Sequence, residues 1–294
     1  MSEETNVQQD NMEGCNPSEC ASCASAGSCS SRMKPEDLIE PQNKMSNVKH
    51  VIGVVSGKGG VGKSFVTGTL AVQLAKTGYK VGIMDADITG PSIQKMFGVK
   101  GEVSGNEHGI FPGATKNGIK IISINMLLDR EDTPVLWRGP VLAGVVKQFW
   151  SDVVWGELDY LLVDMPPGTG DVPMTVFQSL PLDGVIVVTS PQDLVTMIVK
   201  KAYHMAGTMK VKVLGLIENY SYLECPDCGK RINVFGESNI EEVAEEIGSA
   251  VLGKMPLVPE LARLSDEGRF EEIDIDIFAY AVERITSLKS RPVK

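Results

Sequence analysis

Residues 57–64 read Gly-Lys-Gly-Gly-Val-Gly-Lys-Ser, directly after an apolar run rich in Val and directly before a segment with helical periodicity. In this context the pattern predicts a phosphate-binding loop. Its glycines let successive backbone N–H groups face phosphate oxygens, and the helix that follows adds its positive N-terminal end. We expect Lys63 to reach the outer phosphates of ATP and the Ser64 hydroxyl to bind Mg²⁺. The alternative is a glycine-rich turn that holds no ligand. The residues expected around the nucleotide are Gly57, Lys58, Gly59, Gly60, Val61, Gly62, Lys63, Ser64 and Phe65.

Short runs of Val and Ile alternate with helical patterns from residue 50 onwards, as buried parallel strands and their crossover helices do. We therefore predict one α/β P-loop NTPase domain over residues 48–294, a mostly parallel sheet with helices on both faces. Strands are predicted at residues 51–56, 80–85, 119–125, 160–164, 184–189, 213–219 and 250–254. Helices are predicted at residues 64–76, 140–154, 171–179, 194–209, 240–247 and 278–288. Residues 1–47 carry few large apolar side chains, so we expect a flexible or metal-ordered extension there.

The composition is that of a globular protein, with 43% hydrophobic and 22% charged residues in a chain of 294. The net charge of -10 disfavours nonspecific nucleic-acid binding. No apolar run is long enough to span a bilayer, and the first thirty residues lack the pattern of a signal peptide. We expect a cytoplasmic protein that binds neither nucleic acid nor membrane. Its six cysteines are then expected to be reduced and able to bind metal.

Two further polar loops follow predicted strands that end in aspartate. Asp164 closes the run Tyr-Leu-Leu-Val and precedes Met-Pro-Pro-Gly-Thr-Gly-Asp, while Asp85 opens the segment Asp-Ala-Asp-Ile-Thr-Gly-Pro-Ser. Ligands of parallel sheets bind at the carboxyl ends of the strands, so these two loops and residues 57–64 are expected to form one site. A carboxylate at Asp164 suits the outer coordination shell of Mg²⁺, which keeps several waters. Capping of a strand is the alternative.

Cys225-Pro-Asp-Cys228 follows the sixth predicted strand, far from the other cysteines. Two thiolates are half of the set that a structural zinc or a four-iron cluster usually takes. Two copies of the chain across a two-fold axis would complete the set, because such an interface repeats every ligand. The alternatives are a redox dithiol, although the pair does not open a thioredoxin-like helix, and a zinc ribbon, although the second pair is lacking.

Four more cysteines lie within fifteen residues near the start of the chain: Cys15, Cys20, Cys23 and Cys29. Four thiolates are enough for one iron–sulfur cluster or one zinc ion within a single chain. A cysteine-rich tail without metal is the remaining possibility.

The lysine at position 58 makes the phosphate-binding loop similar to the deviant form found in MinD, ParA, nitrogenase iron protein and arsenite-pump ATPases, a resemblance that covers about residues 50–269. It implies that Lys58 reaches across a homodimer to the partner's phosphates, by analogy with an arginine finger. The alternative for Lys58 is a solvated loop charge. It also implies that Asp87 orients the attacking water, and that Asp85 belongs to the magnesium shell or has a structural role. For binding of the nucleotide base, the resemblance points to Asn219 and to Pro256 in the loop 256–260. Closure of a turn is the alternative role for Asn219.

The segments GKGGVGKS, DADITGPS, DMPPGTGD and CPxC, in this order, narrow the resemblance to the Mrp/Nbp branch of ATP-dependent iron–sulfur cluster carriers. The branch implies a homodimer whose paired Cys225 and Cys228 hold a bridging [4Fe-4S] cluster, which passes to an apoprotein. Eukaryotic members carry an N-terminal module of four cysteines with a longer first gap than the chain has here, so the ligation pattern of that module stays open.

The leading hypothesis is thus a homodimeric ATP hydrolase with ATP, Mg²⁺ and a [4Fe-4S] cluster, delivering the cluster to apo iron–sulfur proteins. The alternative is a MinD/ParA-type positioning ATPase that acts on a membrane or on DNA. A membrane-bound version needs a basic amphipathic terminal helix. Residues 274–294 begin acidic and predict a packed terminal helix instead. A purely structural zinc protein would leave the nucleotide motifs unexplained.

Overall fold

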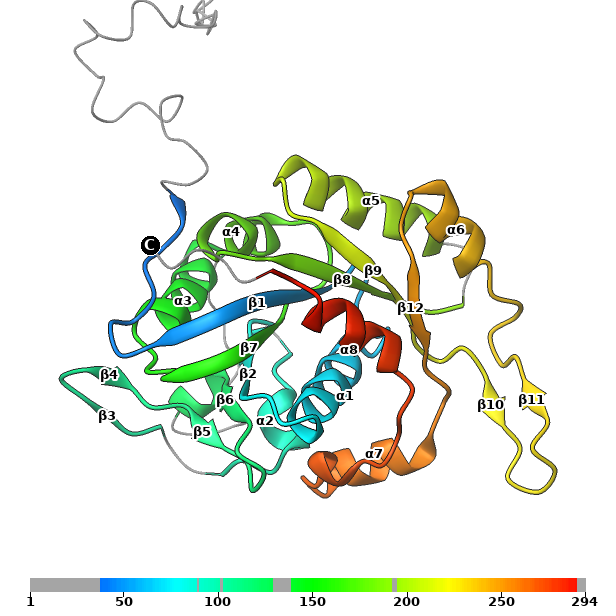
Figure 1. The fold of residues 1–294 in the computed structure, drawn as a ribbon, viewed down its shortest axis with the longest axis horizontal. Coiled ribbons are helices and arrows are strands. Elements are labelled where there is room, and N and C mark those ends of the chain that lie inside the picture. The colour runs from blue at the N-terminus through cyan, green and yellow to red at the C-terminus, as the bar shows by residue number, and fades with distance from the viewer. Residues whose placement is uncertain (1–37, 89, 101–102, 129–138, 192–194, 290–294) are drawn as a thin grey trace, which may run out of the picture. The chain divides into compact units, whose positions relative to one another are not determined.

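Parallel strands dominate the computed structural model, which describes residues 38–88, 90–100, 103–128, 139–191 and 195–289. The sheet strands are β1 (Asn47–Ser56), β2 (Val81–Asp85), β5 (Gly113–Ala114), β6 (Lys120–Ile122), β7 (Glu157–Asp164), β8 (Gly184–Thr189), β9 (Val213–Glu218) and β12 (Val251–Lys254). In this part of the chain they form one sheet with the order β12-β9-β8-β1-β7-β2-β6-β5 (Figure 1). Neighbouring strands are parallel except for the pair β5 and β6.

Helices cover both faces of the sheet (Figure 1). One face holds α1 (Lys63–Lys76), α2 (Ile93–Met96), α7 (Pro259–Asp266) and α8 (Ala279–Thr286), and the other holds α3 (Gly139–Ser151), α4 (Asp171–Ser179), α5 (Val195–Thr208) and α6 (Ile240–Glu246). Successive strand residues point to opposite faces. In β1, Ile52 and Val54 therefore join the core under α1, whereas Val51 and Val55 join the core under α3 to α6. Burial on both faces explains the unbroken apolar runs, and the predicted α/β fold is confirmed.

The strand order brings the three predicted loops together. β1 is flanked by β7, and β2 is the next strand beyond β7. Asp164 at the end of β7 pairs in register with Val54 of β1 and with Asp85 of β2. Because parallel strands end at the same edge of a sheet, the loops that follow β1, β2 and β7 leave side by side.

Several short elements differ from the prediction. β6 stops at Ile122, and a 3-10 helix, η3 (Ile124–Leu127), replaces the rest of the strand predicted at residues 119–125. Helix α2 contains only 4 residues, too few to show a helical period, and α7, with 8 residues, was also not predicted. The other short elements are β3 (Gly105–Asn106), β4 (Gly109–Ile110), β10 (Leu223–Glu224), β11 (Arg231–Ile232) and η4 (Phe270–Glu272).

The compact unit that contains the sheet extends upstream of β1, to Ile39. The backbone N–H of Glu40 donates to the carbonyl of Ser179 at 2.9 Å, and Trp150 Nε1 donates to the carbonyl of Glu40 at 2.8 Å. These hydrogen bonds attach the segment before β1 to α3 and α4, which its polar composition did not indicate. The predicted ligands Cys15, Cys20, Cys23 and Cys29 lie outside the described residues.

Candidate functional site

The phosphate-binding loop leaves the carboxyl end of β1 and enters α1 at Lys63. Gly60 and Gly62 have positive φ values of 80° and 75°, where glycine is favoured. A Cβ on Gly59 or Gly60 would meet no atom within 4 Å, so the loop borders open space. That space is a hollow of about 290 Å³. Its lining includes Gly59, Gly60, Gly62, Lys63, Ser64, Phe65, Asp87, Ser92, Pro167 and Tyr220.

Other residues of the loop have different surroundings. A Cβ on Gly57 would lie 1.8 Å from Cγ2 of Ile198, so this glycine permits close packing against α5. The Val61 side chain is buried in the core under α1. Lys58 is half-buried, its carbonyl accepts a hydrogen bond from Ser56 Oγ at 3.0 Å, and it is not among the residues that line the hollow.

Lys63 lies between carboxylates from the two neighbouring loops. Its Nζ is 2.8 Å from Asp164 Oδ1 and 3.5 Å from Asp87 Oδ2, and its side chain is only 5% exposed. Burial by itself lowers the pKa of Lys63, but the negative charges of Asp164, Asp87 and Asp85 outweigh burial and raise that pKa. The ammonium therefore stays charged at the floor of the hollow, where it can bind an anionic phosphate.

Asp164 is fully buried and accepts two hydroxyl hydrogen bonds besides its ion pair. Ser64 Oγ donates to Oδ2 at 2.6 Å, and Thr67 Oγ1 donates to Oδ1 at 2.8 Å. Thr67 was not predicted, although its position one turn after Lys63 on α1 could have indicated it. Mg²⁺ prefers oxygen ligands, and a carboxylate so fully engaged suits the outer coordination shell. Ser64 and Asp164 thus fit a magnesium site.

Asp85 is also fully buried but is held by other groups. Its Oδ2 accepts hydrogen bonds from the backbone N–H groups of Ser92 and Ile93, at 3.2 and 3.3 Å, and from Ser123 Oγ at 3.2 Å. Burial and the charge of Asp164 raise the pKa of Asp85 to about 8. Of the two predicted roles these contacts favour the structural one, because they fasten α2 and the loop that carries Asp87.

Two residues that follow β9 contact the phosphate-binding loop. Asn219 Nδ2 donates to the carbonyl of Val61 at 2.9 Å, and both partners are buried. A Cβ on Gly62 would stand 2.1 Å from Asn219 Nδ2 and 2.9 Å from the Tyr220 hydroxyl. Tyr220, which the sequence analysis missed, lines the hollow, whereas Pro256 does not. No pattern in the sequence could have linked Tyr220 to a loop about 160 residues away, because hydrophobic periodicity is a local signal.

Cys225 and Cys228 lie in the turn of the β10–β11 hairpin, drawn in yellow at the right edge of Figure 1. Cys225 N donates to the carbonyl of Lys230 at 3.0 Å, and Gly229 N donates to the carbonyl of Cys225 at 2.9 Å. Backbone N–H groups of Asp227 and Cys228 lower the pKa of the Cys225 thiol, which favours the thiolate that binds metals. Among the described residues, no third Cys, His, Asp or Glu joins this pair in a metal-binding group. The pair therefore offers two ligands per described chain.

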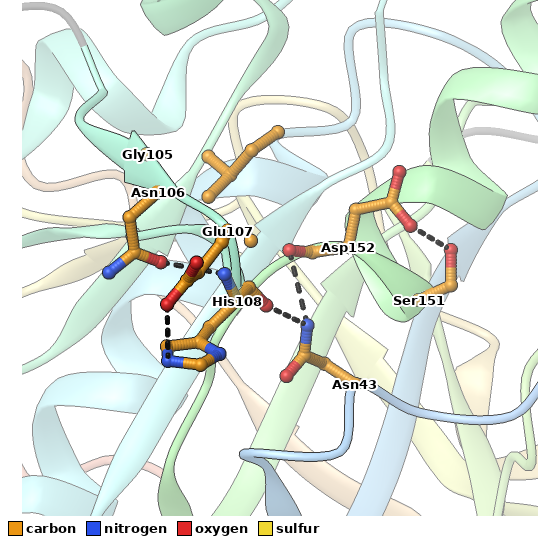
Figure 2. A pocket seen from close by; sticks show the side chains of 9 residues that line it. Asn43, Gly105, Asn106, Glu107, His108, Ser151 and Asp152 are labelled. Carbon is orange, nitrogen blue, oxygen red and sulfur yellow. Dashed lines mark hydrogen bonds and ion pairs between the residues drawn. The ribbon is translucent and has the colours of Figure 1, made fainter.

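A second hollow, of about 410 Å³, lies beside the β3–β4 hairpin (Figure 2). Figure 2 shows Asn43 Nδ2 donating to the carbonyls of His108 and Asp152, at 2.9 and 3.4 Å. Ser151 Oγ donates to Asp152 Oδ1 at 2.7 Å. These polar groups satisfy one another, and no residue with a predicted role lines this hollow. We therefore place the candidate site at the phosphate-binding loop.

Comparisons with known proteins agree with this geometry. A family model described as ParA, NUBPL iron-transfer P-loop NTPase, matches residues 47–288. A protein of Clostridium perfringens named iron-sulfur cluster carrier protein is 47% identical over 266 residues, which are 86% of this chain and 93% of the relative. A protein of the same name from Saccharolobus solfataricus is 49% identical over 232 residues, which are 78% of each chain.

Solved structures show the same likeness. A nucleotide-binding protein from Archaeoglobus fulgidus, solved in complex with ADP, is 46% identical with a TM-score of 0.71, and the match covers 78% of this chain and 90% of that one. The cell-division ATPase MinD of Pyrococcus furiosus has a TM-score of 0.60 at 20% identity, over 82% of this chain and 100% of that one. The second likeness shows the fold alone.

Proposed function

Because the chain belongs to the ParA family of NUBPL-type iron-transfer P-loop NTPases, we propose that it is an ATP-dependent carrier that holds an iron–sulfur cluster and passes it to apoproteins. The position of the cysteine hairpin carries this proposal. The hairpin follows β9, and Asn219, the first residue after β9, contacts the phosphate-binding loop. The chain segment that follows β9 thereby links the candidate nucleotide site to the pair of thiols.

In this proposal Lys63 binds the outer phosphates of ATP. Its ammonium is 2.8 Å from Asp164 and 3.5 Å from Asp87, so an incoming phosphate competes with these carboxylates for the same charge. Ser64, with Asp164 in the outer shell, would hold Mg²⁺, which offsets the charge of the phosphates. The glycines of the loop provide the backbone N–H groups that face the phosphate oxygens.

Hydrolysis is assigned to two further side chains. Asp87 lines the hollow beside Lys63 and would orient the attacking water. Lys58 would act in the partner's site of a homodimer, where it stabilises the charge on the transferred phosphoryl group. Its place outside the lining of its own hollow supports this assignment. We propose slow turnover, with hydrolysis as a switch rather than as the output.

Cys225 and Cys228 are the proposed cargo site. A [4Fe-4S] cluster takes four thiolates, so two chains of a homodimer would each supply two. The four N-terminal cysteines would hold a second cluster or a zinc ion within one chain. Thiolate ligation needs a reducing compartment, which supports a cytoplasmic location. The proposed recipients are apo iron–sulfur proteins, with no role for nucleic acid or membrane.

A positioning ATPase that acts on a membrane or on DNA is the competing function. In α8, Ala281 and Ile285 are buried against the sheet, so this helix does not present an apolar face for a membrane. Within the described ranges, no helix is both long and apolar enough to cross a bilayer.

Anaerobic purification followed by absorption spectroscopy and by iron and sulfide analysis tests the cargo. Iron with acid-labile sulfide is expected, and a colourless zinc protein would contradict the proposal. Nucleotide affinity and phosphate release, measured on wild type and Asp87→Asn, test the switch. The variant should bind ATP and hydrolyse it slowly, and normal turnover would remove Asp87 from the water-positioning role.

A further inference from the structure

Tyr220 has a strained backbone between the two sites. It lies two residues after the end of β9 and five residues before Cys225. Its φ of 59° is in the left-handed region, which a bulky aromatic residue rarely adopts. Such conformations persist only where the surroundings impose them, and they cluster at switch regions. The contacts that hold Tyr220 in this conformation are therefore informative.

One side of Tyr220 contacts the phosphate-binding loop. Its hydroxyl and Cζ lie 2.9 and 3.2 Å from the point where a Cβ on Gly62 would stand. The preceding residue, Asn219, donates to the carbonyl of Val61 at 2.9 Å. Tyr220 also lines the hollow that contains Lys63. A shift of the loop on closing around phosphates must therefore move the Tyr220 ring or displace Asn219.

The other side of Tyr220 contacts the chain that returns from the cysteine hairpin. The rings of Tyr220 and Phe235 have centroids 6.3 Å apart and planes inclined by 51°. Phe235 lies three residues after β11 and is 42% exposed. Nearer the cysteines, the guanidinium of Arg231 lies over the Tyr222 ring at 4.4 Å from its centroid. The Tyr220–Phe235 contact thus links the residue beside the phosphate-binding loop to the chain that leaves the hairpin, and the Arg231–Tyr222 contact joins the two arms of the hairpin.

The base of the hairpin is fastened separately. Glu218 is 1% exposed, and its two carboxylate oxygens accept hydrogen bonds from Ser221 Oγ and Ser238 Oγ, each at 2.7 Å. Ser221 precedes the hairpin and Ser238 follows it, so one buried carboxylate fixes both ends. With the base fixed in this way, the ring contact between Tyr220 and Phe235 offers a route from Gly62 to the hairpin.

We propose that Tyr220 is a positioning residue that couples the nucleotide state to the cysteine hairpin. Nucleotide binding moves Val61 and Gly62, the Tyr220 ring follows, and Phe235 transmits the change to the segment that carries the thiols. Coupling requires two arrangements that differ in free energy between the nucleotide states. The structure shows Tyr220 in one arrangement, with a left-handed backbone at φ 59°, and the proposal takes an extended backbone as the other. The inference rests on the proposed function only in taking this hairpin as the cargo site.

Hydrogen–deuterium exchange of peptides covering residues 221–237 tests the coupling in the full-length chain, with and without saturating Mg-ADP. In the wild type, nucleotide should change the exchange rate by roughly fivefold or more, the lower end of common coupling strengths. Tyr220→Phe keeps the ring and should keep the response. Tyr220→Asn tolerates the left-handed backbone but lacks the ring, and its response should fall below roughly twofold. Phe235→Ala should lose the response in the same way.

Tyr280→Ala is the matched control, because Tyr280 is a 45% exposed tyrosine on α8 and should respond as the wild type does. Saturation is verified for each variant by titration, so that weaker binding is not read as lost coupling. A normal response in Tyr220→Asn or Phe235→Ala, a lost response in Tyr220→Phe, or no response in the wild type would overturn the coupling. Iron content is measured on the same samples to separate the cluster cargo from the coupling through Tyr220. Absence of iron would refute the cluster cargo but would leave the exchange result valid.

Discussion

Substitution of Gly62 by Ala should damage the site in two ways that can be separated. Gly62 has a φ of 75°, and a Cβ there would stand 2.1 Å from Asn219 Nδ2. Gly60 offers a matched comparison, since its φ is 80° and a Cβ there would meet no atom within 4 Å. Both variants carry the backbone cost, but only Gly62→Ala forces a neighbour to move.

The expected difference follows from these contacts. A left-handed backbone costs an L-residue roughly 1–2 kcal/mol, so Gly60→Ala should lose about that much stability. At Gly62 the added methyl group also displaces the buried Asn219 amide from the Val61 carbonyl, to which it donates at 2.9 Å. Leaving such groups without partners costs roughly 1–3 kcal/mol more. Gly62→Ala should therefore be destabilised by roughly 2–5 kcal/mol in total.

Urea unfolding of the nucleotide-free chain measures this difference, provided that each variant unfolds with the same dependence on urea. Asn219→Ala completes a double-mutant cycle, because removing the amide should relieve most of the extra cost at Gly62 while leaving Gly60→Ala unaffected. Equal stabilities of Gly60→Ala and Gly62→Ala, or additive effects of Gly62→Ala and Asn219→Ala, would refute the close approach of Asn219 to the loop.

Three further predictions concern the charged groups and the thiols. Lys63→Ala should abolish tight ATP binding because the outer phosphates lose their ammonium, whereas Lys58→Ala should bind ATP and lose turnover. Calorimetry and phosphate release measured together decide this, and parallel losses in Lys58→Ala would exclude a role in the partner's site. Asp85 has a pKa of about 8 in the folded chain, whereas an ordinary aspartate has a pKa of 3.8. Between these two pH values the folded chain keeps a proton on Asp85 that the unfolded chain has released. Stability of the nucleotide-free chain should therefore fall as the pH rises across that interval, and Asp85→Asn should flatten the fall, as urea unfolding at several pH values would show. A fall that persists unchanged in the variant would assign it to other groups. Cys225→Ala combined with Cys228→Ala should remove about four iron atoms per dimer, keep ADP binding and weaken the dimer. Wild-type iron content, cluster transfer and dimerisation in that variant would make the segment a simple turn.

The fold could be predicted because its signals are local. Runs of Val and Ile buried on both faces mark the central strands wherever they lie in the chain, and the glycine pattern at residues 57–64 marks a strand, loop and helix in succession. The exceptions were elements with too few residues to show a period, such as α2, and the segment before β1. There, Glu40 is ordered by partners on α3 and α4 rather than by its own neighbours.

Some residues of the candidate site were expected from the sequence, whereas Thr67, Tyr220 and the contacts between the residues were not. Lys63, Asp87 and Asp164 each stand in a recognisable motif, and the rule that parallel strands share an edge was enough to expect them together. The different roles of Asp85 and Asp87 could be assigned only from the tertiary structure. In the folded chain Asp85 is buried and bonded to the start of α2, with a raised pKa, while Asp87 lines the hollow.

By itself, the sequence determined the phosphate-binding loop, the α/β fold and the pair of thiols, because each depends on residues that are consecutive or periodically spaced in the chain. The tertiary structure alone decided what joins them. Asn219 and Tyr220 contact the loop because β9 ends at the same edge of the sheet as β1, with β8 between them. Strand order is set by the packing of the whole domain and leaves no mark on the residues of a single strand. The contacts of Asn219 and Tyr220 with the phosphate-binding loop are therefore visible only in the folded chain.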